Sequence, residues 1–168
     1  TKSIEFFEFF EDYIKNQKEL AKSTITDYNQ TLSTLRLFEK EEKYKVLFSS
    51  ITLEFYDKLK GFIMDNQGYS INTFGKRIKV LKTIMRASKD RELHNNTDYE
   101  KRDFKVLSRT YKKPYLKLEE IDLIYKCDLN KKHEKYRDMF LLLCNLGIRI
   151  SDLPQINKGN ISKIQDTN

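Results

Sequence analysis

The sequence is short of the residues that interrupt helices, because its 168 positions include only five glycines and two prolines. Helices tolerate few of either residue, so this shortage favours an α-rich chain. The longest apolar run, Met139 to Cys144, is far too short to cross a bilayer. No basic start followed by an apolar stretch marks a secretory signal. From these absences we expect an intracellular, cytoplasmic protein.

Cysteine is equally scarce. The only two, Cys127 and Cys144, do not form a C-x-x-C pair or another metal-ligand spacing. We therefore expect no metal site, and two buried or half-buried thiols in a reducing compartment.

Charge is abundant and unevenly placed. Charged residues make up 34% of the chain and the net charge is +7. Residues 70–113 hold 13 Lys and Arg against 5 Asp and Glu, whereas residues 1–69 hold 10 against 12. A localised positive field attracts a polyanion such as nucleic acid. An equally good interpretation of the charge alone is a solvated helix face followed by a flexible basic linker.

Hydrophobic periodicity predicts four helices in the first half of the chain, and hence an all-α domain over residues 1–93. The first helix should cover residues 3–18. The second should cover residues 23–42 and be capped by Ser23 or Thr24, and the third should be capped by Thr52.

The fourth predicted helix, residues 72–91, separates apolar from basic side chains. At 100° per residue its apolar side holds Phe74, Ile78, Leu81 and Met85. A neighbouring side carries one sign of charge, with Lys76, Lys79, Lys82, Arg86 and Lys89. This is an amphipathic helix with a basic polar face.

Residues 94–113 show little periodicity and predict an extended basic linker that ends at Lys112, Lys113 and Pro114. A second, mainly α segment, residues 114–168, should follow. It holds expected helices at residues 118–125 and 134–146, and a strand near Ile161. The helix before Gly147 is apolar nearly all round, so we expect it to be buried centrally.

One arginine stands on a turn between two expected helices. The first of these helices ends at Gly147, Arg149 follows, and Ser151 is placed to cap the next helix. A guanidinium held in this way suits a phosphate bound by a fork of two hydrogen bonds. The local alternative is an ion pair with Asp152 or Asp138, and without further context that alternative is the stronger one.

Residues 146–153 read L-G-I-R-I-S-D-L, which resembles the first catalytic-arginine box of the tyrosine recombinases (phage-integrase family), T-G-x-R-x-S/T-E/D-L. The segment Tyr115 to Ile121 resembles the opening of that family's catalytic domain, and Arg137 to Leu141 resembles the helix that leads into the box. Residues 3–91 resemble its core-binding, SAM-like four-helix domain. Leu146 departs from the usual Thr, and Lys117 stands where a capping Thr is common.

The resemblance implies an all-α, SAM-like DNA-binding domain followed by the start of a recombinase catalytic domain. It implies double-stranded DNA as the partner, no metal or ATP, and Arg149 as the first catalytic arginine. The expected DNA contacts are Thr24, Lys76, Lys79, Lys82, Arg86, Lys89, Lys112 and Lys113. It also implies a synaptic tetramer on DNA for the full-length enzyme, in the bacterial nucleoid, and a monomer for this chain.

The family's later elements are a lysine, an H-x-x-R box, a second His or Trp and a nucleophilic tyrosine, all downstream of the arginine box. Only 19 residues follow Arg149, and neither His94 nor His133 begins H-x-x-R, so both are interpreted as surface histidines. We therefore expect DNA binding without strand cleavage. Two other hypotheses stay open: a natural truncated binder that competes for recombination sites, and a helical adaptor whose basic face meets an acidic protein.

Overall fold

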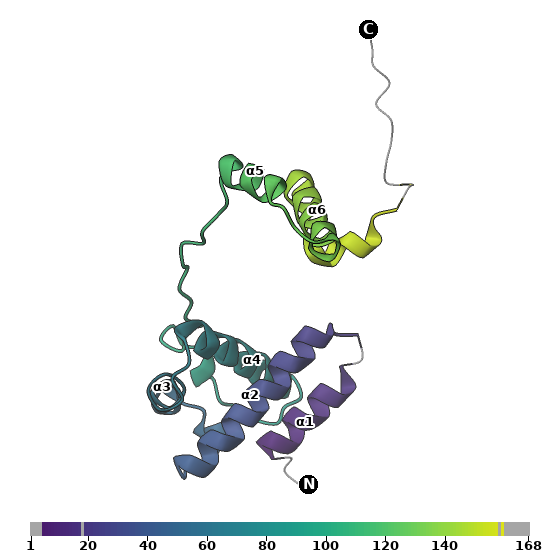
Figure 1. The fold of residues 1–168 in the computed structure, drawn as a ribbon. Coiled ribbons are helices and arrows are strands. Elements are labelled where there is room, and N and C mark those ends of the chain that lie inside the picture. The colour runs from purple at the N-terminus through teal and green to yellow at the C-terminus, as the bar shows by residue number, and fades with distance from the viewer. Residues whose placement is uncertain (1–4, 18, 158, 160–168) are drawn as a thin grey trace. The chain divides into compact units, whose positions relative to one another are not determined.

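A computed structural model of the chain describes residues 5–17, 19–157 and 159. The chain divides into two compact units, Thr1–Tyr111 and Lys112–Asn168, each with its own helices (Figure 1). All regular structure in the described ranges is helical, as the periodicity predicted. The strand expected near Ile161 lies outside those ranges. Among the described residues, no helix combines the length and the apolarity that crossing a membrane requires.

The first unit contains the four predicted helices. They are α1 (Phe6–Asn16), α2 (Lys22–Glu41), α3 (Leu53–Gly61), which continues as the π-helical turn η2 (Phe62–Asn66), and α4 (Ile71–Lys89). Two short 3-10 turns, η1 (Phe48–Ser50) and η3 (Asp98–Glu100), lie between and after them.

Side chains cap the starts of α3 and α4, but not those of α1 and α2. Thr52 caps α3 as predicted, because its hydroxyl accepts a hydrogen bond from the amide of Phe55. The hydroxyl of Ser70 caps α4 in the same way. At the start of α2, however, the cap position is Ala21, and no side chain caps the helix. The expected cap by Ser23 or Thr24 is therefore wrong, and the amides of Thr24 and Ile25 donate instead to the carbonyl oxygen of Ala21, at 2.9 and 3.2 Å.

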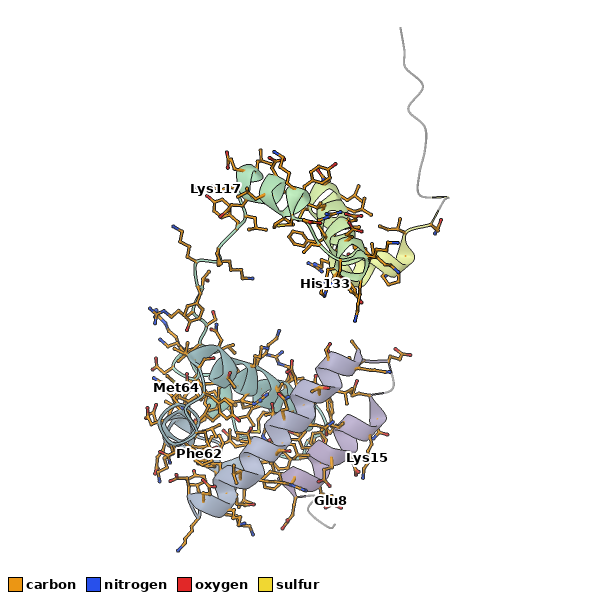
Figure 2. The ribbon with its side chains drawn as sticks, viewed as in Figure 1. Glu8, Lys15, Phe62, Met64, Lys117 and His133 are labelled. Atoms are coloured by element: carbon orange, nitrogen blue, oxygen red, sulfur yellow. The ribbon has the colours of Figure 1, made fainter. Side chains whose placement is uncertain are left out.

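Aromatic side chains fill the core of the first unit. Helix α1 buries Phe6, Phe9 and Phe10, while Glu8 and Lys15 lie on its exposed side (Figure 2). Each such phenylalanine contributes about 1.5–3 kcal/mol by leaving water. The core joins segments that are distant in sequence, and it fixes the positions of α2 and α4 within the first unit.

A strap made of residues 94–109 packs on this core, and corrects the expectation of an extended linker that begins at residue 94. Tyr99 and Phe104 within it are fully buried. The hydroxyl of Tyr56 donates to the carbonyl oxygen of Lys105 at 2.9 Å. Two buried aromatic side chains thus anchor a segment that has no helical periodicity.

The end of the strap lies directly against α4 at Gly75. A Cβ atom on Gly75 would lie only 1.8 Å from the carbonyl oxygen of Leu107, so this close approach requires glycine. One helical turn earlier, the Asn72 side chain pairs with the backbone of Arg109. Its Oδ1 accepts from the Arg109 amide at 2.6 Å, and its Nδ2 donates to the Arg109 carbonyl at 3.0 Å.

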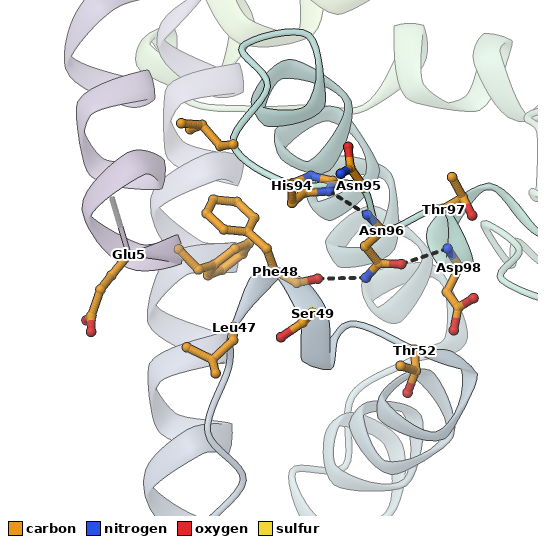
Figure 3. Close-up of a pocket in the computed structure, with 12 residues that line it drawn as sticks. Glu5, Leu47, Phe48, Ser49, Thr52, His94, Asn95, Asn96, Thr97 and Asp98 are labelled. Atoms are coloured by element: carbon orange, nitrogen blue, oxygen red, sulfur yellow. Dashed lines mark hydrogen bonds between the residues drawn. The ribbon is translucent and has the colours of Figure 1, made fainter. Parts of the chain in front are cut away.

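The start of the strap is a turn organised by His94, which is half-buried, contrary to the surface position expected for it. Its ring stacks on Phe48, with 5.0 Å between centroids. Nδ1 accepts from the amide of Asn96 at 3.1 Å, so the proton of the neutral ring is on Nε2, 3.0 Å from the carbonyl oxygen of Met85. Asn96 also donates to the carbonyl oxygen of Phe48 (Figure 3). A hollow of about 760 Å³ lies beside this turn, and the hydrogen bonds of Asn96 to His94, Phe48 and Asp98 join residues that line it.

The second unit contains α5 (Leu118–Lys126), α6 (Lys131–Leu146) and the 3-10 turn η4 (Ile150–Gln155). Helix α6 begins earlier than predicted because the Asn130 side chain caps it by accepting from the amide of His133. It ends at Gly147, whose φ of 63° is left-handed, as the sequence predicted.

None of the helices in the second unit has a fully buried side chain. Helix α6 is therefore not buried centrally as expected, and Leu142 is 46% exposed. Cys127 and Cys144 are both exposed thiols, which corrects the expectation of burial. The physical reason is that α5 and α6 are too few helices to cover each other's apolar sides within this unit.

Candidate nucleic-acid interface

The basic residues of α4 that were expected to act together are divided into two groups by the strap. Lys76, Lys79 and Arg86 are exposed, and none of them forms an ion pair within the described part of the chain. Lys82 and Lys89 instead contact the strap. Helical periodicity places all five near one face, but only the first group remains free for a ligand.

The two strap-bound lysines have structural contacts. Lys82 Nζ donates to the carbonyl oxygen of Phe104 at 2.9 Å. Burial lowers the pKa of Lys82, and the neighbouring charge of Arg86 acts in the same direction. Lys89 Nζ lies 3.0 Å from a carboxylate oxygen of Glu100, which weakens its attraction for a polyanion.

Lys76 and Lys79 line one small hollow together with Thr24, the residue of α2 that was also expected to contact DNA. The hollow has a volume of about 270 Å³. Thr24 lies in the first turn of α2, which has no side-chain cap, and the positive end of the helix dipole there favours an anion. Asp27 also lines the hollow and offsets one of the two lysine charges.

A second hollow of about 580 Å³, which the sequence analysis missed, lies beside α2. Arg77 belongs to it and donates from Nη2 to Oε1 of Gln30 at 3.0 Å. Burial lowers the pKa of Arg77, while Asp27 raises it by a smaller amount. The signal that could have revealed this hollow is the run of uncharged polar residues along the exposed side of α2.

The remaining expected contacts belong to the second unit. Lys112 and Lys113 are exposed and line a shallow hollow with Pro114, Tyr115 and Lys117. Their contact with DNA stays a prediction.

Arg149 is exposed and directly precedes η4, at its cap position. It forms no ion pair within the described residues: Asp138 instead accepts from Nε of Arg137 at 2.9 Å, and Asp152 accepts from the hydroxyl of Ser151 at 3.0 Å. Ser151 lies inside η4, so the expectation that it caps this helix is wrong. The guanidinium is thus available to a ligand.

No group of three or more His, Cys, Asp or Glu side chains in the described ranges could hold a metal ion.

A family model described as the phage integrase SAM-like domain matches residues 5–106, which covers the helices of the first unit and most of the strap. No curated protein and no solved structure matches the chain.

Proposed function

The chain belongs to the phage integrase SAM-like domain family, and we propose that its first unit binds double-stranded DNA through α4 and the first turn of α2. The observation that carries the proposal is the hollow that Lys76 and Lys79 share with Thr24. Neither lysine has an ion-pair partner among the described residues. The start of α2, which also borders this hollow, has no side-chain cap. Both features favour the phosphate groups of a duplex.

Electrostatics supports the same conclusion. The excess of positive charge is confined to residues 70–113, which include α4 and the strap, while residues 1–69 are slightly acidic. A phosphate backbone that meets this region releases condensed counterions, which is the main source of affinity for DNA without regard to sequence. Because Lys82 and Lys89 contact the strap, we assign the phosphate contacts to Lys76, Lys79 and Arg86.

The test is equilibrium binding of a fluorescently labelled duplex, followed by anisotropy. Changing Lys76 and Lys79 together to Ala should weaken binding roughly 10- to 30-fold, at about 1 kcal/mol per lost contact. The matched control changes Lys40 and Lys45, which are exposed and lie near the other end of α2, to Ala. It removes the same charge, so equal losses in both variants would show that net charge alone attracts the DNA.

We further propose that the second unit is the beginning of a tyrosine-recombinase catalytic domain, with Arg149 as its first phosphate-binding arginine. The support is the motif of residues 146–153 and the exposed guanidinium next to the left-handed Gly147. In a protein that carries the complete catalytic domain, Arg149→Lys should nearly abolish the covalent protein–DNA adduct, because a point charge cannot make two parallel hydrogen bonds. Adduct formation at the wild-type rate would show that Arg149 has only a structural role.

A further inference from the structure

The part of α2 that lines the second hollow is unusual in carrying hydrogen-bonding groups but no charge. Five of the residues that line the second hollow lie on this helix and are uncharged and polar: Thr26, Asn29, Gln30, Ser33 and Thr34. Among the described residues that line this hollow, only Arg77 is charged. Charged residues make up 34% of the whole chain, so an uncharged patch of this size in the middle of an exposed helix needs an explanation.

Helix stability does not provide that explanation. Ser, Thr and Asn are weaker helix formers than Lys, Glu or Arg, because their side chains compete with the backbone for hydrogen bonds. Such competition is present here, since the hydroxyls of Thr26 and Thr34 donate to carbonyl oxygens one turn back, at 2.9 and 2.7 Å. Asn29, Gln30 and Ser33 are exposed, so packing does not require them either.

The hydrogen bond from Arg77 fixes the orientation of the Gln30 side-chain amide. A guanidinium can only donate, so the atom of Gln30 that it meets at 3.0 Å is the carbonyl oxygen Oε1. The amide nitrogen of Gln30 therefore keeps its two N–H donors for another partner. Asn29, the neighbouring residue, presents a second exposed amide.

Uncharged amides and hydroxyls beside an arginine are the groups that distinguish base edges in the major groove. Gln and Asn pair with adenine through its N6 and N7 atoms, and Ser and Thr can contact any base. An α-helix fits the groove, whose width of about 12 Å matches a helix with its side chains. The same helix also contributes Thr24 to the hollow of Lys76 and Lys79, where phosphate is favoured.

From this we infer that Asn29 and Gln30 read bases and determine the sequence specificity of the first unit, while the lysines of α4 provide affinity. This inference rests on the proposed DNA binding and deepens it.

The experiment is selection of bound duplexes from a pool with a randomised central region, using the whole chain. Wild type should enrich a motif that contains adenine. Gln30→Ala should relax one or two adjacent positions of that motif, with a roughly 10- to 100-fold loss of discrimination. The dependence of affinity on salt should not change, because no phosphate contact is lost.

A second variant separates base reading from a merely structural role. Gln30→Glu keeps an acceptor for Arg77 but removes the N–H donors, and a carboxylate accepts from the amino group of cytosine. The preferred base at the affected position should therefore shift from adenine toward cytosine. The control is Asn16→Ala, because Asn16 is an exposed asparagine at the end of α1 and should leave the motif unchanged.

The outcomes distinguish this inference from the proposed function. If wild type binds DNA with steep salt dependence but enriches no motif, the base-reading inference is overturned and DNA binding stands. If the variants keep the wild-type motif, or lose affinity equally for all sequences, the inference also fails. If wild type binds no duplex in the pool, both fail together.

Discussion

Replacing Gly75 by alanine tests the contact between α4 and the strap. The new Cβ atom would lie 1.8 Å from the carbonyl oxygen of Leu107, and 3.0 Å from its carbonyl carbon. Because real Cβ contacts are essentially never shorter than 3.0 Å, the strap must move by at least 1.2 Å, the difference between 3.0 and 1.8 Å. The atom in the way is backbone, so no side-chain rotation relieves the clash.

The magnitude follows from the hydrogen bonds that such a shift disturbs. Two of them join Asn72 to Arg109, and a third joins the hydroxyl of Tyr56 to Lys105. Each contributes about 0.5–1.5 kcal/mol to stability. Alanine in a helix interior is better than glycine by about 1 kcal/mol, which offsets part of the loss. We expect Gly75→Ala to lower the free energy of unfolding by about 1–3 kcal/mol.

The assay is urea unfolding followed by far-ultraviolet circular dichroism, with Gly61→Ala as the matched control. Gly61 is also helical, but a Cβ atom there would meet only Asp65 Oδ2 at 3.7 Å, an ordinary contact. The control should be neutral or more stable than wild type by up to about 1 kcal/mol. If Gly75→Ala is as stable as Gly61→Ala, the strap does not lie against α4 as described.

Three further predictions concern single side chains. Thr52→Ala should cost about 0.5–2 kcal/mol in urea unfolding and Thr52→Ser much less, because only alanine removes the cap on the amide of Phe55. Arg149→Ala should change thermal stability by less than about 0.5 kcal/mol, since the side chain is exposed; a large loss would mean that it has a hidden structural partner. Burial raises the pKa of Tyr99 from 10.0 to about 12, so the folded state favours the neutral phenol. This contribution to the free energy of unfolding is fully present below pH 10 and should be lost as the pH rises toward 12. In urea unfolding, Tyr99→Phe should lose less stability than wild type between pH 10 and 12, and equal losses would contradict a raised pKa for Tyr99.

Much of the fold could be predicted from the sequence, because local patterns fixed it. Apolar spacing predicted the four helices of the first unit, and the hydroxyl of Thr52 predicted the start of α3. Gly147 predicted the end of α6. Two predicted helix starts were wrong. Helix α6 begins earlier than predicted because Asn130 caps it, and α2 begins without a side-chain cap.

The strap could not be predicted from periodicity, because it is held by contacts between residues distant in sequence. Tyr99 and Phe104 are two apolar residues in a charged segment, and only the core shows that they are anchors. The same contacts explain why the basic face of α4 was predicted only in part. The spacing of the basic residues along α4 could be derived from the sequence. The contacts that Lys82 and Lys89 make with the strap could not.

The central claim is that phosphate contacts from α4 bind this chain to duplex DNA, and the salt dependence of affinity measures those contacts directly. The logarithm of affinity should fall linearly with the logarithm of salt concentration, with a slope of about −0.9 per phosphate contacted. For the variant with Lys76 and Lys79 changed to Ala, the slope should be shallower by about 1.8, whereas the control at Lys40 and Lys45 should keep the wild-type slope. A wild-type affinity that does not depend on salt, or no DNA binding even at low salt, would contradict the account and favour a protein adaptor.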